Sequence, residues 1–107
     1  MTAFSKAMVM AAGLGLRMRP LTNDRPKPLG MVAGKPLIDH TLDWLAQSGI
    51  KEAVVNSHYK AEMLEAHLSA RRAPRIHVSR EEVLLETGGG VKKAMPMLGD
   101  APFFITN

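Results

Sequence analysis

Apolar residues fall along this chain in short unbroken runs that are separated by longer stretches with helical spacing. The run at 6–12 lacks the polar alternation of a strand with one face in water, so it predicts a central parallel strand covered on both faces. The run at 103–106 predicts a second fully buried strand. Shorter runs predict strands at 52–56 and 76–78.

Apolar positions at a spacing of about 3.6 residues predict three helices between these strands. The first follows Gly34-Lys35-Pro36 and ends at Gly49; its expected core stripe is Leu37, Ile38, Thr41, Leu42, Leu45 and Ala46. The second has its expected core face at Ala61, Leu64, Ala66 and Leu68. The third runs from Val91 to Leu98, after a glycine cluster at 88–90 that is predicted to be a ligand-facing turn. This alternation is typical of an α/β domain with a parallel sheet and right-handed crossovers.

The first apolar run leads into a glycine turn and then into a group of basic residues. Gly13 and Gly15 lack a Cβ, so backbone N–H groups in this turn can approach an anion closely. Side chains that can form charge-assisted hydrogen bonds with phosphate follow at Arg17, Arg19, Arg25 and Lys27. Prolines at 20, 26 and 28 exclude a regular helix and stiffen the segment. The sequence therefore predicts a long phosphate-binding loop.

The net charge of the chain, +4, comes from this region. Residues 17–35 contain five basic side chains and one acidic side chain, whereas the rest of the chain is balanced. A positive field focused on one loop suits a small anion better than a nucleic acid duplex. We therefore expect no nucleic acid partner.

Composition also bears on the compartment. The 107 residues contain no cysteine, which excludes disulfides and agrees with a reducing cytoplasm. There is no run of 18 or more apolar residues, and the first residues lack the long apolar stretch of a secretory leader. We expect one soluble, cytoplasmic unit without a membrane partner.

Two common phosphate-binding motifs are excluded by their spacing. Gly13-Leu-Gly15 has Met18 where the dinucleotide fingerprint has its third glycine, and no helical pattern follows directly. The segment from Gly30 to Lys35 has three residues between its glycines where a P-loop has four, and Pro36 replaces the hydroxyl residue.

The remaining pattern resembles the nucleotidyltransferase family that makes nucleotide sugars from a nucleoside triphosphate and a sugar 1-phosphate. The matching segments are the loop at 11–28, Gly-Lys-Pro-Leu-Ile at 34–38, Val-Val-Asn-Ser-His-Tyr at 54–59 and Leu-Glu-Thr-Gly-Gly-Gly at 85–90. The last two look most like the N-acetylmuramate 1-phosphate uridylyltransferases, with mannose-1-phosphate guanylyltransferases next. The resemblance implies a doubly wound, mostly parallel Rossmann-like sheet of strand order 3-2-1-4, with its ligand at the carboxyl ends of the strands.

The resemblance also implies a nucleotide site made by two segments. Ala11, Ala12 and Gly13 would lie against the nucleobase and ribose, since small side chains at the end of a strand leave room for a flat ring. Thr87 and Gly88 would meet the base or the sugar from the second glycine cluster.

The same resemblance assigns the phosphate chemistry to the basic loop. Gly15 and Arg17 would hold the triphosphate, and Arg17 would stabilise the charge that develops as the sugar phosphate attacks the α-phosphorus. Lys27 would hold the α-phosphate or the incoming phosphate. Arg17 and Lys27 are therefore the expected catalytic residues.

The implied reaction is Mg²⁺-dependent nucleotidyl transfer that yields a nucleotide sugar and pyrophosphate. UTP and N-acetylmuramate 1-phosphate, a cell-wall sugar, are the favoured substrates, and GTP with mannose 1-phosphate is the alternative. The family's metal-binding aspartate follows the fourth strand by one or two residues, where the sequence given stops at Asn107. Residues 1–107 would therefore be the N-terminal nucleotide-binding portion of the domain, without a metal ligand and incomplete at the C-terminus. A nucleotide-binding module without catalysis is the alternative from another class.

A few further polar and aromatic residues have more than one reading. His58 is either a structural histidine or a contact on the sugar side, and Glu86 either touches ligand or has a turn or cap role. Glu81 and Glu82 are expected to be solvated acids, and Trp44 is expected to be a packing residue.

Overall fold

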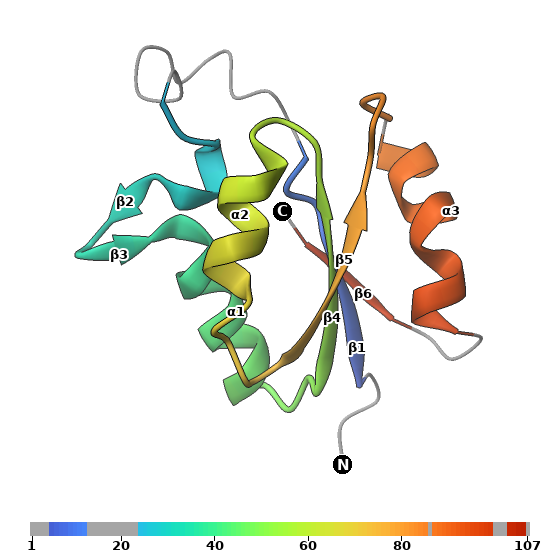
Figure 1. The fold of residues 1–107 in the computed structure, drawn as a ribbon. Coiled ribbons are helices and arrows are strands. Elements are labelled where there is room, and N and C mark those ends of the chain that lie inside the picture. Colours follow the sequence, from blue (N-terminus) through green and yellow to red (C-terminus); the bar gives the residue numbers. More distant parts are fainter. Residues whose placement is uncertain (1–4, 13–23, 86, 100–102, 107) are drawn as a thin grey trace.

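The computed structural model describes residues 5–12, 24–85, 87–99 and 103–106. Its main sheet has four parallel strands in the order β5-β4-β1-β6 (Figure 1). The strands are β1 (Lys6–Val9), β4 (Glu52–Ser57), β5 (Arg75–Arg80) and β6 (Phe104–Thr106). Numbered among themselves along the chain they follow the order 3-2-1-4, so the predicted strand order is confirmed.

Strand β1 lies inside the sheet because its side chains are apolar on both faces. Ala7, Met8 and Val9 are all buried. Met8 is in register with Val54 of β4 on one side and with Ile105 of β6 on the other. A strand covered on both faces needs apolar residues at successive positions, which is why the sequence pattern predicted its central place.

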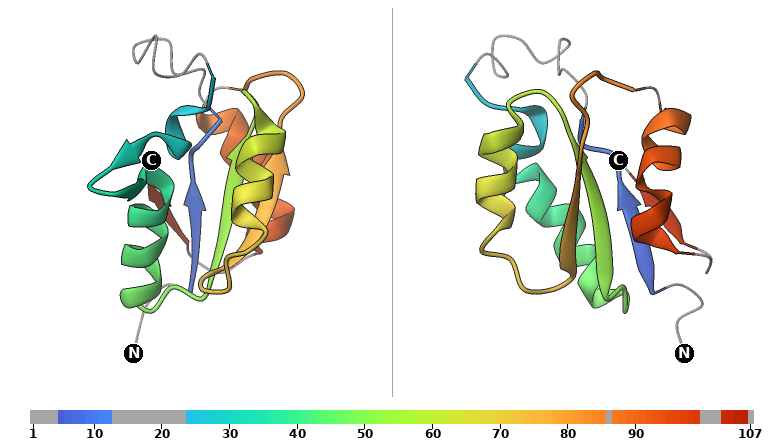
Figure 2. Two further views of the ribbon diagram at one scale, coloured as in Figure 1. Left: turned by 60° about the vertical axis from the view of Figure 1, so that its left-hand side comes forward. Right: turned by 45° about the vertical axis from the view of Figure 1, so that its right-hand side comes forward.

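Helices cover both faces of the sheet, as the views in Figure 2 show. Helices α1 (Leu37–Gln47) and α2 (Ala61–Leu68) pack on one face, and α3 (Thr87–Leu98) packs on the other. The predicted doubly wound arrangement is confirmed. None of the helices in the described residues is long and apolar enough to cross a membrane.

The core stripe of α2 differs at one position from the prediction. Ala61, Leu64 and Leu68 are buried, as their spacing of three and four residues predicts. Ala66 is exposed, so its predicted place in the core is wrong. It lies two residues from Leu64 and from Leu68, which turns it toward the opposite side of a helix of eight residues.

Strand β6 is more exposed than its apolar run predicts. Phe104 and Ile105 are 37% and 49% exposed, so the prediction of a fully buried strand is wrong. Within the described residues, β6 is the edge strand of the sheet and has β1 as its one neighbour. Trp44 of α1 packs beside it, with its ring centroid 5.7 Å from that of Phe104.

The proline-rich segment before α1 forms small elements that the sequence pattern did not predict. A 3-10 helix, η2 (Lys27–Leu29), is followed by an antiparallel pair of short strands, β2 (Met31–Val32) and β3 (Lys35–Pro36). Helix α1 begins only at Leu37, because Pro36 is extended, with a ψ of 143°.

Candidate functional site

The candidate site lies where the parallel strands end. All four strands run in the same direction, so their carboxyl ends lie along one edge of the sheet (Figure 2). Ala11 and Ala12 follow β1 at this edge, Asn56 and Ser57 end β4, and Glu81 follows β5. Ligands of open α/β sheets bind at such an edge, where the strand order reverses.

Asn56 holds the backbone that follows β1. The backbone N–H of Met10 still donates to Thr106 of β6, at 2.8 Å, but the next two N–H groups have left the sheet. Both donate to Oδ1 of Asn56, from Ala11 at 2.5 Å and from Ala12 at 3.1 Å. Because Asn56 is only 2% exposed, water does not compete for these bonds. The sequence placed Ala11 and Ala12 in the site but did not identify Asn56.

Glu81 extends this contact to the next strand. Its carboxylate accepts hydrogen bonds from Nδ2 of Asn56, at 3.1 Å, and from the backbone N–H of Leu85, at 3.0 Å. The residue is 1% exposed, so the prediction of a solvated acid is wrong. No ion pair of Glu81 is found in the part of the chain that the structure describes. The two polar side chains form a buried unit, here called the Asn56–Glu81 pair.

His58 is oriented by the backbone of Glu81. Its Nδ1 lies 2.6 Å from the backbone carbonyl oxygen of Glu81. A carbonyl oxygen can only accept, so Nδ1 carries the proton and donates it. This contact fits the structural reading of His58, which ties the end of β4 to the end of β5.

The start of α3 packs against the Asn56–Glu81 pair. Helix α3 begins at Thr87, so Gly88 and Gly90 lie in its first turns, and the prediction of a turn before the helix is wrong. A Cβ on Gly90 would lie 3.0 Å from Oε2 of Glu81 and 3.2 Å from Nδ2 of Asn56. A Cβ on Gly88 would meet nothing within 4 Å among the described atoms. Gly90 thus allows a close approach of the helix, whereas Gly88 faces open space.

The basic loop is described only in its second half. Gly13, Gly15 and Arg17, all predicted site residues, lie outside the described residues, as does Glu86. Lys27 begins η2, is exposed and forms no ion pair with the described residues.

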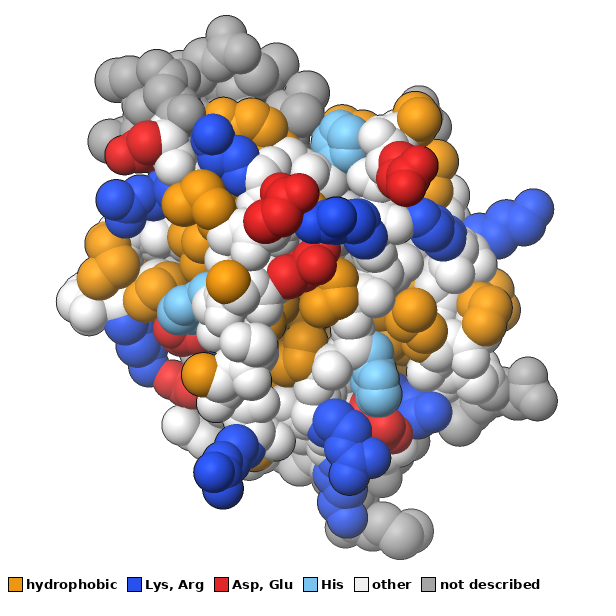
Figure 3. All heavy atoms as spheres, viewed as in Figure 1, with side chains coloured by type: hydrophobic (Ala, Val, Ile, Leu, Met, Phe, Trp, Pro, Cys, Tyr) orange, Lys and Arg blue, Asp and Glu red, His pale blue; other side chains and the backbone are white. Residues whose placement is uncertain are grey.

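Two other basic residues of this region are paired with acids. Arg25 lies 3.6 Å from Asp24. Lys35 pairs with Asp43 of α1, so it does not add to a phosphate-binding field. On the face seen in Figure 3, basic side chains are scattered and acidic ones lie beside several of them.

The described residues contain no cluster of three metal ligands. Within 5–12, 24–85, 87–99 and 103–106, no three His, Asp or Glu side chains are grouped so that they could hold a metal ion. No step of the chemistry is therefore assigned to a metal held by these residues.

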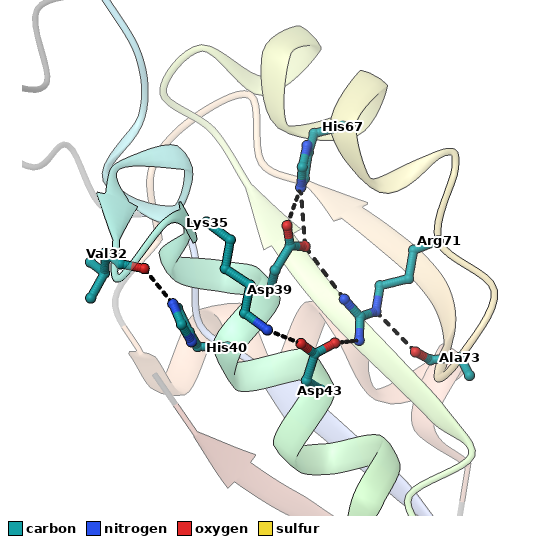
Figure 4. Close-up of polar contacts among 8 residues, drawn as sticks. All are labelled: Val32, Lys35, Asp39, His40, Asp43, His67, Arg71 and Ala73. Atoms are coloured by element: carbon teal, nitrogen blue, oxygen red, sulfur yellow. Dashed lines mark hydrogen bonds and ion pairs between the residues drawn. The ribbon is translucent and has the colours of Figure 1, made fainter.

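A second polar cluster lies away from the strand ends, between α1 and the end of α2. Arg71 contacts Asp39 at 3.4 Å and Asp43 at 2.5 Å, while His67 lies 3.0 Å from Asp39. Figure 4 shows these contacts together with the pairing of Lys35 and Asp43. The cluster lines a pocket of about 290 Å³. Each carboxylate in it is already paired, so we read the cluster as a link between the two helices.

The cluster predicts an acid-sensitive contribution to stability. Hydrogen bonds from Lys35 and then from Arg71 lower the pKa of Asp43 to about 2, against an ordinary value of 3.8. A carboxyl group with a lowered pKa stabilises the folded state above pH 3.8, and this contribution is lost as the pH falls to about 2. Asp43→Asn is expected to lower the melting temperature at pH 7 and to weaken its dependence on pH between 4 and 2.

Thermal unfolding across this pH range measures the effect. Glu62→Gln is the matched control, because Glu62 is 82% exposed and its pair with Arg80 is expected to contribute little. An Asp43→Asn variant with the same acid dependence as the wild type would contradict the prediction.

The chain is similar in sequence to known nucleotidyltransferases. The family model described as nucleotidyl transferase matches residues 6–107. An N-acetylmuramate alpha-1-phosphate uridylyltransferase of Caulobacter vibrioides is 60% identical over 106 residues, which are 94% of this chain and 44% of that protein. A mannose-1-phosphate guanyltransferase of Hypocrea jecorina is 36% identical over 107 residues, which are 95% of this chain and 29% of that protein. The chain thus spans less than half the length of these relatives.

A solved structure shows the same fold. The crystal structure of HddC from Yersinia pseudotuberculosis, complexed with GMP-PN, superimposes with a TM-score of 0.85 at 24% identity. The match covers 97% of this chain and 47% of that one. Since the family model covers nearly every residue and the parallel sheet has the expected strand order, the chain belongs to the nucleotidyl transferase family.

Proposed function

We propose that the protein containing this chain transfers a uridylyl group from UTP to N-acetylmuramate 1-phosphate. A phosphate oxygen of the sugar 1-phosphate forms a bond to the α-phosphorus of UTP. The bond from that phosphorus to the β-bridging oxygen breaks, and pyrophosphate leaves with the electron pair. The observation that carries this choice of substrates is the 60% identity with the uridylyltransferase of Caulobacter vibrioides.

The proposal gives the described end of β1 the task of receiving the nucleoside. Ala11 and Ala12 have the small side chains that a flat base requires beside it, and Asn56 fixes their backbone. Gly13 would continue this surface, and Thr87 and Gly88 would approach the base or the sugar from the start of α3.

Phosphate binding is assigned to the basic loop. Gly15 would admit the triphosphate to backbone N–H groups, and Arg17 would stabilise the charge that develops at the α-phosphate. Lys27, exposed and without an ion pair among the described residues, would hold the α-phosphate or the sugar phosphate. These assignments rest on the resemblance of the loop to the family pattern.

The proposal includes Mg²⁺ as cofactor, the cytoplasm as compartment and residues 1–107 as the N-terminal nucleotide-binding portion of the domain. Phosphoryl transfer needs positive charge against the developing charge of the phosphates, and Mg²⁺ commonly supplies it. The described residues include no cluster of three metal ligands, and Mg²⁺ is commonly held by one or two carboxylates together with the substrate phosphates.

There are two alternatives. Transfer of a guanylyl group from GTP to mannose 1-phosphate is supported by the 36% identity with the guanyltransferase of Hypocrea jecorina. A module that binds nucleotide without catalysis is the alternative from another class.

Pyrophosphate release tests all three. The full-length protein is assayed with each of the four nucleoside triphosphates against N-acetylmuramate 1-phosphate, mannose 1-phosphate and glucose 1-phosphate, with and without Mg²⁺. We expect the highest kcat/KM with UTP and N-acetylmuramate 1-phosphate. Without Mg²⁺ we expect no pyrophosphate release from any pair. A preference for GTP and mannose 1-phosphate would support the first alternative, and tight binding of nucleotide without turnover on any pair would support the second.

A further inference from the structure

We propose that Asn56 and Glu81 are positioning residues that hold two nucleotide-contacting segments in place relative to each other. One segment is the backbone at Ala11 and Ala12, and the other runs from Glu81 through Leu85 to α3. The inference rests on the proposed function, because it assumes that nucleotide binds between these segments.

The hydrogen bonds determine which atom of each side chain faces which neighbour. The backbone N–H groups of Ala11 and Ala12 can only donate, so the oxygen of the Asn56 amide must face them. Its Nδ2 then faces Glu81, whose second carboxylate oxygen accepts from Leu85. Rotation of the Asn56 amide by 180° would turn its Nδ2 toward the two backbone N–H donors and its oxygen toward the Glu81 carboxylate. Only one orientation of the amide therefore satisfies all of these hydrogen bonds.

Because Asn56 and Glu81 are buried, any of their hydrogen bonds that is not formed would destabilise the folded state. Asn56 is 2% exposed and Glu81 is 1% exposed. A buried polar group that loses its partner costs free energy, and a buried charge costs more. An apolar pair of similar size would pack between the strands without this cost, but it could not hold the N–H groups of Ala11 and Ala12. The polar pair therefore serves the placement of the backbone beyond β1.

The contacts join three strand ends and one helix. Asn56 belongs to β4, its amide holds the chain that follows β1, and Glu81 follows β5. Gly90 lets α3 lie so close to the same carboxylate that a Cβ at this position would be 3.0 Å from Oε2 of Glu81. A change in the pair is thus expected to move both segments that the nucleotide would contact. The residues assigned to phosphate binding are not changed by it.

Exchanging the two functional groups tests the inference in the full-length protein. Asn56→Asp would place two carboxylate oxygens against each other, and Glu81→Gln would leave one amide NH₂ facing a donor in either orientation. In the Asn56→Asp, Glu81→Gln double variant, the new aspartate accepts from the backbone and from the new glutamine, whose oxygen accepts from Leu85. The double variant therefore restores every donor and acceptor and keeps the same net charge.

We expect each single variant to raise the Kd for UTP, measured by calorimetry with Mg²⁺, by about tenfold or more. The double variant is expected to bind UTP within about threefold of wild type. The KM for the sugar 1-phosphate is expected to change less than the Kd for UTP in all of them. Leu68→Ala, a core variant in α2, is the control for stability alone and is expected to leave the Kd unchanged.

Amide hydrogen exchange gives a readout that does not depend on turnover. The N–H groups of Ala11 and Ala12 are expected to exchange faster in each single variant and at the wild-type rate in the double variant. Single variants with wild-type UTP affinity would overturn the inference, as would a double variant that binds as weakly as the single ones. If a single variant does not fold, the double variant decides by the same two measurements. A wild-type protein that binds no nucleotide contradicts the proposed function itself, and unchanged exchange in the variants contradicts the placement role.

Discussion

Arg17→Ala is expected to lower the turnover of the full-length protein by about a thousandfold or more, because an arginine that stabilises the transition-state charge of phosphoryl transfer has an effect of that order. The melting temperature is expected to stay within about 3 °C of wild type, because a side chain that serves the ligand adds little to the stability of the free protein. Pyrophosphate release and thermal unfolding of the same preparation measure the two quantities.

Arg25→Ala is the matched control. It removes the same charge from the same proline-rich region, but Arg25 pairs with the exposed Asp24 at 3.6 Å. Its turnover is expected to stay within about threefold of wild type, since exposed ion pairs contribute little. Equal losses in both variants would mean that only the net positive charge of the loop matters. Near-normal turnover of Arg17→Ala would remove Arg17 from the mechanism.

The fold could be predicted largely because burial on both faces leaves a clear pattern. The unbroken apolar run at 6–12 gave the central strand, and the spacing of Ile38, Leu42 and Leu45 gave the buried face of α1. The same rule failed for Phe104 and Ile105. An unbroken run shows that both faces of a strand are apolar, but it does not show how many neighbours cover them.

The sequence names the backbone of the candidate site but not the polar side chains that support it. Ala11 and Ala12 are named through the resemblance of the loop at 11–28 to the family pattern. Asn56 and Glu81 are not named, because they are buried by contacts between residues 44 and 25 positions apart. An acid in an isolated sequence is best read as solvated. The one local sign for Glu81 was its place between a strand end and a glycine cluster.

The start of α3 could not be predicted because glycine has a low helix propensity. Three successive glycines disfavour a helix, so the sequence predicted a turn at 88–90 and a helix only from Val91. In the structure the helix begins at Thr87. Packing against the Asn56–Glu81 pair needs a residue without a Cβ at Gly90, which explains why a poor helix former stands inside this helix.

Gly90→Val is expected to lower the free energy of unfolding of the full-length protein by about 2 kcal/mol, a typical effect of overpacking. A Cβ at this position would lie 3.0 Å from Oε2 of Glu81, 3.1 Å from Cε of Met10 and 3.2 Å from Nδ2 of Asn56. The Met10 methyl ends a flexible side chain and can move away. The other two atoms are hydrogen-bonded to each other, so displacing either one breaks a buried bond.

Gly88→Val separates this crowding from the helical preference of valine. Both glycines lie in the first turns of α3, but a Cβ at Gly88 would meet nothing within 4 Å among the described atoms. The free energy of unfolding of Gly88→Val, from urea denaturation, is therefore expected to stay within about 0.5 kcal/mol of wild type. Equal losses in both variants would show that helix formation, not contact with the Asn56–Glu81 pair, sets the effect. A loss confined to Gly90→Val, together with weaker UTP binding, would tie the packing of α3 to the nucleotide site.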